Sequence, residues 1–177
     1  MVLAVETPET SKASVSSEVK CEQKENGLND TLLDELKTEF ESLATTADFN
    51  RVGCDVKPVF ATKERIVCEM TLGPGHVNAK GTLHGGQTAA LTDIVTARAL
   101  GQTIKDRPMA SIELSVIYML PVKLGEVIEI TANVLKIGRN VAFSEAEFRR
   151  KSDGKLAAKG RHTVAILPKP AQEGEKM

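Results

Sequence analysis

The sequence predicts an α+β fold in which one long central helix is wrapped by a curled antiparallel sheet of about six strands. Residues 89–100 indicate the central helix, because they are small or apolar on nearly every side, as in a helix buried in a core. Six strand-like runs indicate the sheet, and the last four follow one another through tight turns. A chain of 177 residues is long enough for one such domain with tails at both ends.

An amphipathic helix is predicted at the start of the ordered region, from about residue 30 to residue 46. Its apolar face is formed by side chains spaced three or four residues apart: Leu32, Leu36, Phe40 and Leu43. Residues 1–28 are rich in Ser, Thr, Glu and Lys, and this composition predicts a disordered extension. The folded domain is therefore expected over residues 29–167, followed by a flexible polar tail over residues 168–177.

The strands are predicted from runs in which apolar and polar residues alternate. Two runs precede the central helix and four follow it: residues 52–61, 65–71, 111–119, 126–136, 141–151 and 155–167. The turns "KIGRN" and "KSDGK" carry the Gly, Asn and Asp residues that hairpins require. Strands of about ten residues joined by such turns favour a strongly curled sheet.

The composition excludes several classes of function. The formal net charge is -1 and aromatic residues make up 3%, so neither a basic surface nor stacking platforms for nucleic acid are expected. The three cysteines and three histidines lack the spacing of a disulfide framework or a metal site. No apolar run approaches the ~18 residues needed to cross a bilayer. We therefore expect no metal, no cofactor, no nucleic-acid partner and no transmembrane segment.

The start of the central helix carries two glycines, Gly85 and Gly86, directly after a histidine. The first N–H groups of a helix have no helical partner, and glycine lets a ligand oxygen approach them closely. This geometry suits a carbonyl oxygen that becomes negatively charged during a reaction. The same glycines would also permit close packing of the helix on the sheet, and their spacing alone does not separate the two interpretations.

Asp93 is a lone carboxylate among small and apolar residues of the same helix. An ionised carboxylate in such surroundings needs a partner, or its pKa rises. Asp93 could be tied to a nearby cation such as Arg98, or could point to solvent at one edge of the helix. The alternative is a catalytic role as a general base or a nucleophile.

The spacing of Gly85 and Asp93 predicts how they would act together. Eight residues separate them, which is about 12 Å along a helix axis. A water molecule that attacks a carbonyl must lie within about 3 Å of both its base and the carbonyl carbon. One chain cannot easily present both groups to one carbonyl. We therefore expect a homodimer with composite active sites, each combining Gly85 of one chain with Asp93 of the other.

Several motifs together resemble those of the hotdog-fold acyl-CoA thioesterases, in particular the eukaryotic acyl-CoA thioesterase 13 type. The resemblance rests on "HVNAKGTLHGG", Asp93, "SIELSVIYMLPVKLGE" and "GKLAAKGRHT", and extends from about residue 30 to residue 165. It implies a hotdog fold, in which a curled antiparallel sheet wraps a long helix. It also implies hydrolysis of fatty acyl-CoA to free fatty acid and CoA by dimers of dimers. The expected location is cytoplasmic or mitochondria-associated.

The resemblance implies a role for each residue of the motif. The N–H group of Gly85 polarises the thioester carbonyl, and Asn78 and His84 help to hold the thioester end. Asp93 of the partner chain either activates the attacking water or attacks the carbonyl itself, and the sequence does not separate these mechanisms. Ser111 orients the water near that aspartate.

The resemblance also implies a binding surface for the CoA part of the substrate. The segments "YMLPVK" and "KIGRNV" match those that contact CoA in the family, and their cations are expected to bind phosphates. The candidate CoA-binding residues are Glu113, Tyr118, Met119, Leu120, Pro121, Val122, Lys123, Lys136, Ile137, Gly138, Arg139, Asn140 and Val141.

Two other functions on the same fold stay open from the sequence. A hotdog enoyl-CoA hydratase would need an Asp and a His a few residues apart, whereas His84 precedes Asp93 by nine positions. A non-catalytic acyl-CoA sensor could dispense with Asp93 and Ser111, so their presence weighs against it. Hydration of crotonyl-CoA without thiol release would favour the hydratase, and tight acyl-CoA binding without turnover would favour the sensor.

Overall fold

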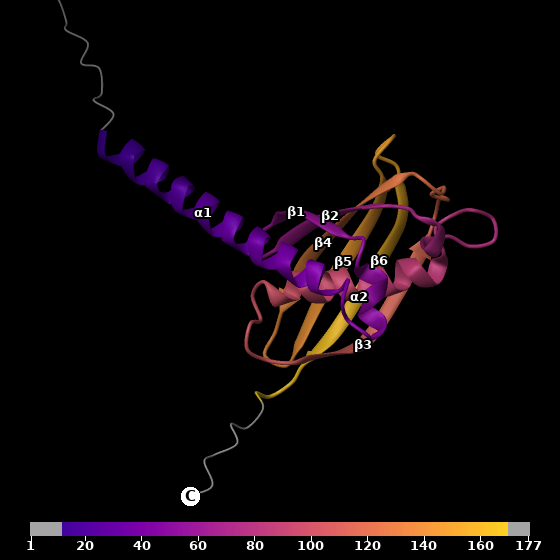
Figure 1. The fold of residues 1–177 in the computed structure, drawn as a ribbon. Helices are drawn as coiled ribbons and strands as arrows, with labels where there is room; N and C mark the ends of the chain where they lie inside the picture. Colours follow the sequence, from indigo (N-terminus) through magenta and orange to yellow (C-terminus); the bar gives the residue numbers. More distant parts are fainter. Residues whose placement is uncertain (1–11, 170–177) are drawn as a thin grey trace, which may run out of the picture.

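The computed structural model describes residues 12–169, and side chains over residues 27–169. Figure 1 shows helix α2 (Gly85–Gly101) lying across a six-stranded sheet that curls around it. The strands follow the order β1-β2-β4-β5-β6-β3, and every neighbouring pair is antiparallel. The expected fold class, a long central helix wrapped by a curled antiparallel sheet, is confirmed.

The strand boundaries follow the alternation of apolar and polar residues closely. The strands are β1 (Lys57–Ala61), β2 (Arg65–Thr71), β3 (Met109–Tyr118), β4 (Val127–Ile137), β5 (Val141–Arg150) and β6 (Leu156–Ile166). The last four lie within two residues of their predicted limits. Ile128, Ile130 and Ala132 of β4 are fully buried, so the apolar face predicted for this strand is the core face.

Helix α1 (Lys12–Ser42) begins well before the predicted start near residue 30. Its backbone is helical over residues 12–28, where composition predicted disorder. Residues 12–26 contain neither Gly nor Pro and are rich in good helix formers, so the helix continues beyond its buried part. Figure 1 shows this N-terminal half projecting away from the sheet. Residues 1–11 and 170–177, for which disorder or flexibility was also predicted, lie outside the described residues.

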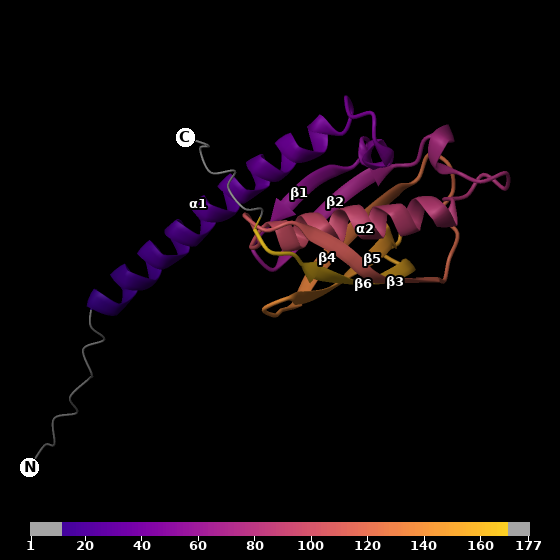
Figure 2. The same ribbon diagram turned by 90° about the horizontal axis from the view of Figure 1, so that it is seen from below.

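The C-terminal half of α1 packs on the sheet beside β1, as Figure 2 shows. Its buried side chains are the ones predicted from helical spacing: Leu32, Leu36, Phe40 and Leu43. No helix within residues 12–169 combines the length and the apolar composition needed to span a bilayer.

The first predicted strand is wrong over its first half. Residues Phe49–Gly53 form a short 3₁₀ helix, which begins where the Asp48 carboxylate accepts a hydrogen bond from the N–H of Asn50 at 2.8 Å. Gly53 packs so closely that a Cβ there would lie 3.3 Å from Leu43. This turn seats α1 against α2, and the strand begins only at Lys57.

Helix α2 fits tightly into the curl of the sheet. Its buried residues are Thr88, Leu91, Thr92, Ile94, Val95, Thr96, Ala99 and Leu100. The closest approach is at Gly160 of β6, where a Cβ would lie 2.4 Å from Cγ2 of Thr92. The hydroxyls of Thr92 and Thr96 donate to helix carbonyls four residues earlier, so these polar groups are satisfied inside the core.

Strand β3 is an edge strand with an uncovered apolar surface. It pairs with β6 on one side, and no described strand pairs with its other side. Ile112 is 58% exposed and Ile117 is 65% exposed, and Leu114 is also exposed. The alternation predicted for this strand is interrupted by a register shift between Ser111 and Glu113. A bulge of this kind inserts one extra residue into the strand. The residues beyond it therefore face the opposite side of the sheet from the side that simple alternation predicts.

The contact at Gly160 gives a test of the fold. Gly160→Ala forces a methyl group against Thr92, so we expect the free energy of unfolding to fall by about 1–3 kcal/mol. Denaturant unfolding of the variant and the parent chain measures this difference. Gly101→Ala is the control, because no atom lies within 4 Å of its Cβ position at the end of α2, the helix that carries Thr92. Equal stability of Gly160→Ala and the parent would contradict the close contact.

Candidate active site

The first turn of α2 leaves the backbone N–H groups of Gly85 and Gln87 without an acceptor in the described chain. The helix begins at Gly85, and His84 is its N-cap residue. The N–H of Gly86 donates to Nδ1 of His84 at 2.9 Å and is therefore already used. The N–H of Gly85 donates to no acceptor in the described chain. His84 thus has a structural role as a helix cap, and Gly85 supplies the donor that can reach a ligand oxygen.

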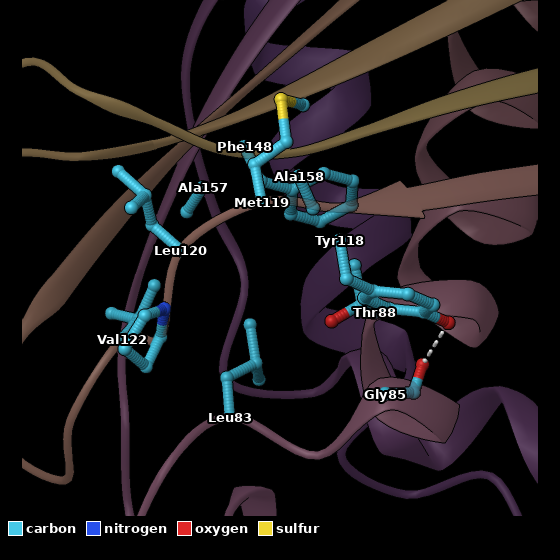
Figure 3. A pocket seen from close by; sticks show the side chains of 11 residues that line it. Leu83, Gly85, Thr88, Tyr118, Met119, Leu120, Val122, Phe148, Ala157 and Ala158 are labelled. Carbon is cyan, nitrogen blue, oxygen red and sulfur yellow. Dashed lines mark hydrogen bonds between the residues drawn. The ribbon is translucent and has the colours of Figure 1, made fainter.

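A mostly apolar pocket opens beside Gly85, which we call the Gly85 pocket. It encloses about 340 Å³ and is lined by Leu83, Gly85, Thr88, Tyr118, Met119, Leu120, Pro121, Val122, Phe148, Ala157 and Ala158. Figure 3 shows Tyr118 reaching Gly85, with its hydroxyl donating to the Gly85 carbonyl at 2.9 Å. A Cβ at Gly85 would lie 3.4 Å from the Tyr118 ring, so the glycine lies against a pocket-lining side chain.

Asp93 is held by two side chains from the neighbouring strands. Ser111 of β3 donates from its hydroxyl to Oδ1 of Asp93 at 2.7 Å. Nε2 of His162, on β6, lies 3.1 Å from the same oxygen and 3.0 Å from Oγ of Ser111. Nδ1 of His162 lies 2.6 Å from the hydroxyl of Thr96. Both nitrogens of the buried ring therefore contact a side-chain oxygen, and a proton on Nε2 points toward the Asp93 carboxylate.

These contacts keep Asp93 ionised. The hydrogen bond from His162 is the main cause that lowers the pKa of Asp93 below its usual value, and Ser111 contributes in the same direction. Partial burial opposes this effect. Both hydrogen bonds go to Oδ1, and no donor in the described chain contacts Oδ2. The side chain is 43% exposed, so an oriented and charged oxygen is left to accept a proton from a ligand. Arg98, the alternative partner expected for Asp93, pairs with Glu39 instead.

Asp93 opens onto a second hollow, which we call the Asp93 cavity. It encloses about 370 Å³ and is lined by Glu39, Asn50, Asp93, Ile94, Ala97, Arg98, Gly101, Ile104, Lys105 and Met109. It shares no lining residue with the Gly85 pocket. Along β3, Ser111 near the start and Tyr118 at the end are separated by roughly 23 Å of extended chain. One protomer therefore holds its free N–H group and its carboxylate in two separate places.

Asn78 braces its own loop and does not line either hollow. Its Oδ1 accepts from the N–H of Lys80 at 2.9 Å, and its Nδ2 donates to Thr82 at 3.0 Å. The loop is also held by His76, which is buried, accepts from the N–H of Gly73 and pairs with Asp55. Asn78 and His76 thus fix the segment that leads into Gly85.

The two predicted CoA-binding segments lie at opposite ends of the sheet. Residues 118–122 line the Gly85 pocket. The turn at 138–140 lies beside the start of β3 and the end of β6, where its carbonyls accept from Arg107 and Ile166. Glu113 pairs with Thr163, next to the inward-facing His162, so it points to the outer face of the sheet. Of the predicted CoA-binding residues, those at 118–122 border the Gly85 pocket of their own protomer.

The cations of these segments are available for a ligand. Lys123, Lys136 and Arg139 form no salt bridge with any residue between 27 and 169. Lys123 follows the pocket-lining segment directly, and its backbone is bridged to Thr82 of the loop that leads to Gly85.

His162 is the site residue that sequence analysis missed. It is 1% exposed and faces α2 from the middle of β6. A buried histidine in a strand has no local feature that distinguishes it from a hydrogen-bonded core residue. The available signal was its position in the alternation of β6, where it takes the place of an apolar residue.

The family model for the thioesterase superfamily matches residues 80–157. The Caenorhabditis elegans protein named "Putative esterase F42H10.6" is 59% identical over 140 residues, which cover 79% of this chain and 83% of that protein. Human acyl-coenzyme A thioesterase 13 is 41% identical over 128 residues, covering 72% of this chain and 91% of the relative. The chain belongs to the thioesterase superfamily. It is a thioester hydrolase, and the enzyme class expected from the sequence is confirmed.

A solved structure agrees with this family. The crystal structure of zebrafish thioesterase superfamily member 2 superimposes on this thioesterase with a TM-score of 0.73 at 40% identity. The match covers 76% of this chain and 97% of the zebrafish chain. The resemblance to the acyl-CoA thioesterase 13 type and the hotdog fold expected from it are therefore confirmed.

The Asp93 contacts predict how the stability of this thioesterase depends on pH. Because folding lowers the pKa of Asp93, its contribution to stability is present above the unfolded value near pH 4 and is lost as pH falls through the folded value. Asp93→Asn removes the titrating group. We expect the difference in unfolding free energy between the parent and Asp93→Asn to shrink from about pH 5 towards pH 2. Denaturant unfolding at several pH values measures it, and a difference independent of pH would contradict the hydrogen-bonded, ionised carboxylate.

Proposed function

We propose that this thioesterase hydrolyses fatty acyl-CoA to a free fatty acid and CoA at active sites shared between two protomers. The proposal rests on one observation: the two candidate catalytic groups of α2 border two different hollows. The free N–H of Gly85 borders one, and the anchored carboxylate of Asp93 borders the other. The identity to human acyl-coenzyme A thioesterase 13 supports acyl-CoA as the substrate class.

The exposed edge strand supports a two-fold dimer. A strand edge with unpaired backbone groups and exposed apolar side chains is stabilised by pairing with another strand. If two β3 strands pair antiparallel about a two-fold axis, the Ser111 end of one lies beside the Tyr118 end of the other. This arrangement would bring Asp93 of one protomer to Gly85 of its partner and would form two equivalent sites.

A further pairing of dimers is also part of the proposal. Leu135, Ile137 and Phe143 are exposed at the β4–β5 end of the sheet, next to the turn that carries Lys136 and Arg139. Burial of this apolar group between dimers would bring the second CoA-binding segment to a neighbouring protomer. The expected location stays cytoplasmic or mitochondria-associated, on the grounds of the resemblance.

The proposed reaction proceeds by addition of water to the thioester. The carbonyl oxygen accepts a hydrogen bond from Gly85 of one protomer, and Asp93 of the other removes a proton from the attacking water. The water oxygen forms a bond to the carbonyl carbon, and the negative charge that develops on the carbonyl oxygen is stabilised by the N–H group. The C–S bond then breaks, and the CoA thiolate takes up the proton. Ser111 and His162 hold Asp93 so that Oδ2 faces the water.

The hydratase alternative is weakened by the burial of His162. A hydratase needs a second group that delivers a proton to the substrate. His162 is paired with Asp93, but its ring is 1% exposed and both nitrogens already contact protein side chains. It therefore acts through Asp93 and not on a ligand. Thiol release from acyl-CoA, measured beside hydration of crotonyl-CoA, separates the two activities.

Substitution of either catalytic group tests the proposed chemistry. Asp93→Asn removes the general base, and we expect the kcat for acyl-CoA hydrolysis to fall about 10²–10⁴-fold. Gly85→Val blocks the approach to the free N–H group, and a fall of about 10²–10³-fold is expected. A continuous thiol-release assay with several acyl chain lengths measures both. Asp34→Asn on the exposed surface of α1 serves as the charge-matched control. Full activity of Asp93→Asn with folded protein would disprove the mechanism.

Mixing the two inactive variants tests the shared site. When Asp93→Asn and Gly85→Val chains exchange at equal concentration, half of the dimers are mixed, and one of the two sites in each mixed dimer is intact. We therefore expect recovery of about one quarter of the parent activity. Subunit exchange is verified independently by native mass spectrometry. Exchange without any recovery would show that each site is built from one chain.

A further inference from the structure

The Asp93 cavity has two chemically different walls. Its apolar wall consists of Ile94, Ala97, Ile104 and Met109, and its charged wall consists of charged and amide side chains: Glu39, Asn50, Asp93, Arg98 and Lys105. The Gly85 pocket has no charged lining residue. If residues 118–122 hold the CoA side of the thioester at the Gly85 pocket, the acyl group extends into the Asp93 cavity of the partner.

Arg98 is the charged group best placed to meet the end of an acyl chain. It lies five residues after Asp93 on α2, which is about 7.5 Å further along the helix axis. Its Nη1 is 3.2 Å from Oε2 of Glu39 on α1, and the two side chains are 32% and 39% exposed. A second pair, Lys105 with Glu35 at 2.8 Å, holds the same part of α1 to the loop after α2. Each of these ion pairs lies within one protomer and joins one cation to one carboxylate.

The energetics favour an anionic acyl end over a hydrocarbon end at this wall. A half-exposed ion pair such as Arg98–Glu39 contributes at most about 1 kcal/mol, so Arg98 can exchange one carboxylate for another at little cost. The guanidinium has five donors in a planar arrangement that binds carboxylates with two hydrogen bonds. A hydrocarbon end would instead displace water from the charged side chains without offering them hydrogen bonds. This desolvation is unfavourable.

We propose that Arg98 is a specificity residue that binds a carboxylate at the far end of the acyl chain, so that the substrates of this enzyme include ω-carboxyacyl-CoA thioesters. This inference rests on the proposed hydrolysis at the shared site. In it, the acyl carboxylate displaces Glu39 from Arg98, and the apolar wall of the Asp93 cavity covers the methylene groups between the thioester and the carboxylate. Glu39 occupies the anion position when no such substrate is bound.

Two variants of the ion pair separate this role from a structural one. The assay compares kcat/KM for suberyl-CoA and octanoyl-CoA, which differ only in a terminal carboxylate. Arg98→Met removes the cation, and we expect the suberyl-to-octanoyl ratio to fall about tenfold to a hundredfold. Glu39→Gln removes the competing anion, and the ratio is expected to rise about two- to fivefold. Lys37→Met on the exposed surface of α1 is the matched control, with the ratio unchanged.

Opposite shifts in the two variants support the inference, because loss of a merely structural ion pair would move both ratios alike. Shifts in the same direction, or no shift, overturn it. If Arg98→Met does not fold, as judged by thermal unfolding, Arg98→Lys replaces it, and a fall in the ratio is again required. If the parent enzyme hydrolyses octanoyl-CoA but the variants do not show these shifts, only the role of Arg98 is rejected. Failure of the parent enzyme to release thiol from either substrate rejects the proposed function itself.

Discussion

The hydrogen bonds from Ser111 and His162 to Asp93 join the three elements that surround this carboxylate. Asp93 lies on α2, Ser111 on β3 and His162 on β6. The hydroxyl of Ser111 and Nε2 of His162 both lie within 3.1 Å of Oδ1 of Asp93. The contact satisfies a carboxylate that would otherwise be half-buried without a partner. It also fixes the position of the edge strand relative to the helix. The orientation of the reactive oxygen and the fold of this end of the sheet thus have the same cause.

The length of α2 underlies the proposal that two protomers share each site. Its N-terminus carries the free N–H group, and its middle carries the carboxylate, so the two face different hollows. Close packing at Gly160 fixes the helix in the curl of the sheet, and neither group can slide towards the other. If both groups act on one thioester, a shared site follows from their placement on one rigid helix. Binding energy for CoA and for the acyl group would then come from different chains.

Much of the fold was predictable because its signals are local. The alternation in β4, β5 and β6 reflects one face buried under α2, and the spacing of Leu32, Leu36 and Phe40 reflects the buried face of α1. Gly85 and Asp93 are candidates from the sequence because each is unusual in its surroundings. The remaining features depend on contacts between distant segments. Simple alternation places Ser111 away from Leu114 and Tyr118, whereas the bulge after Ser111 turns its hydroxyl towards Asp93. His162 acquires its role only because β6 lies between β3 and the rest of the sheet.

The uncovered edge of β3 has a consequence for the behaviour of the newly made protein. Ile112 and Ile117 stand beside unpaired backbone groups, and such an edge can recruit any extended chain and not only its proper partner. In the proposed dimer, pairing of two β3 strands would remove this hazard at the same moment as it completes the shared sites. Solubility and turnover are then governed by one strand, and changes that weaken self-association at this edge would yield aggregates before they yield an inactive monomer.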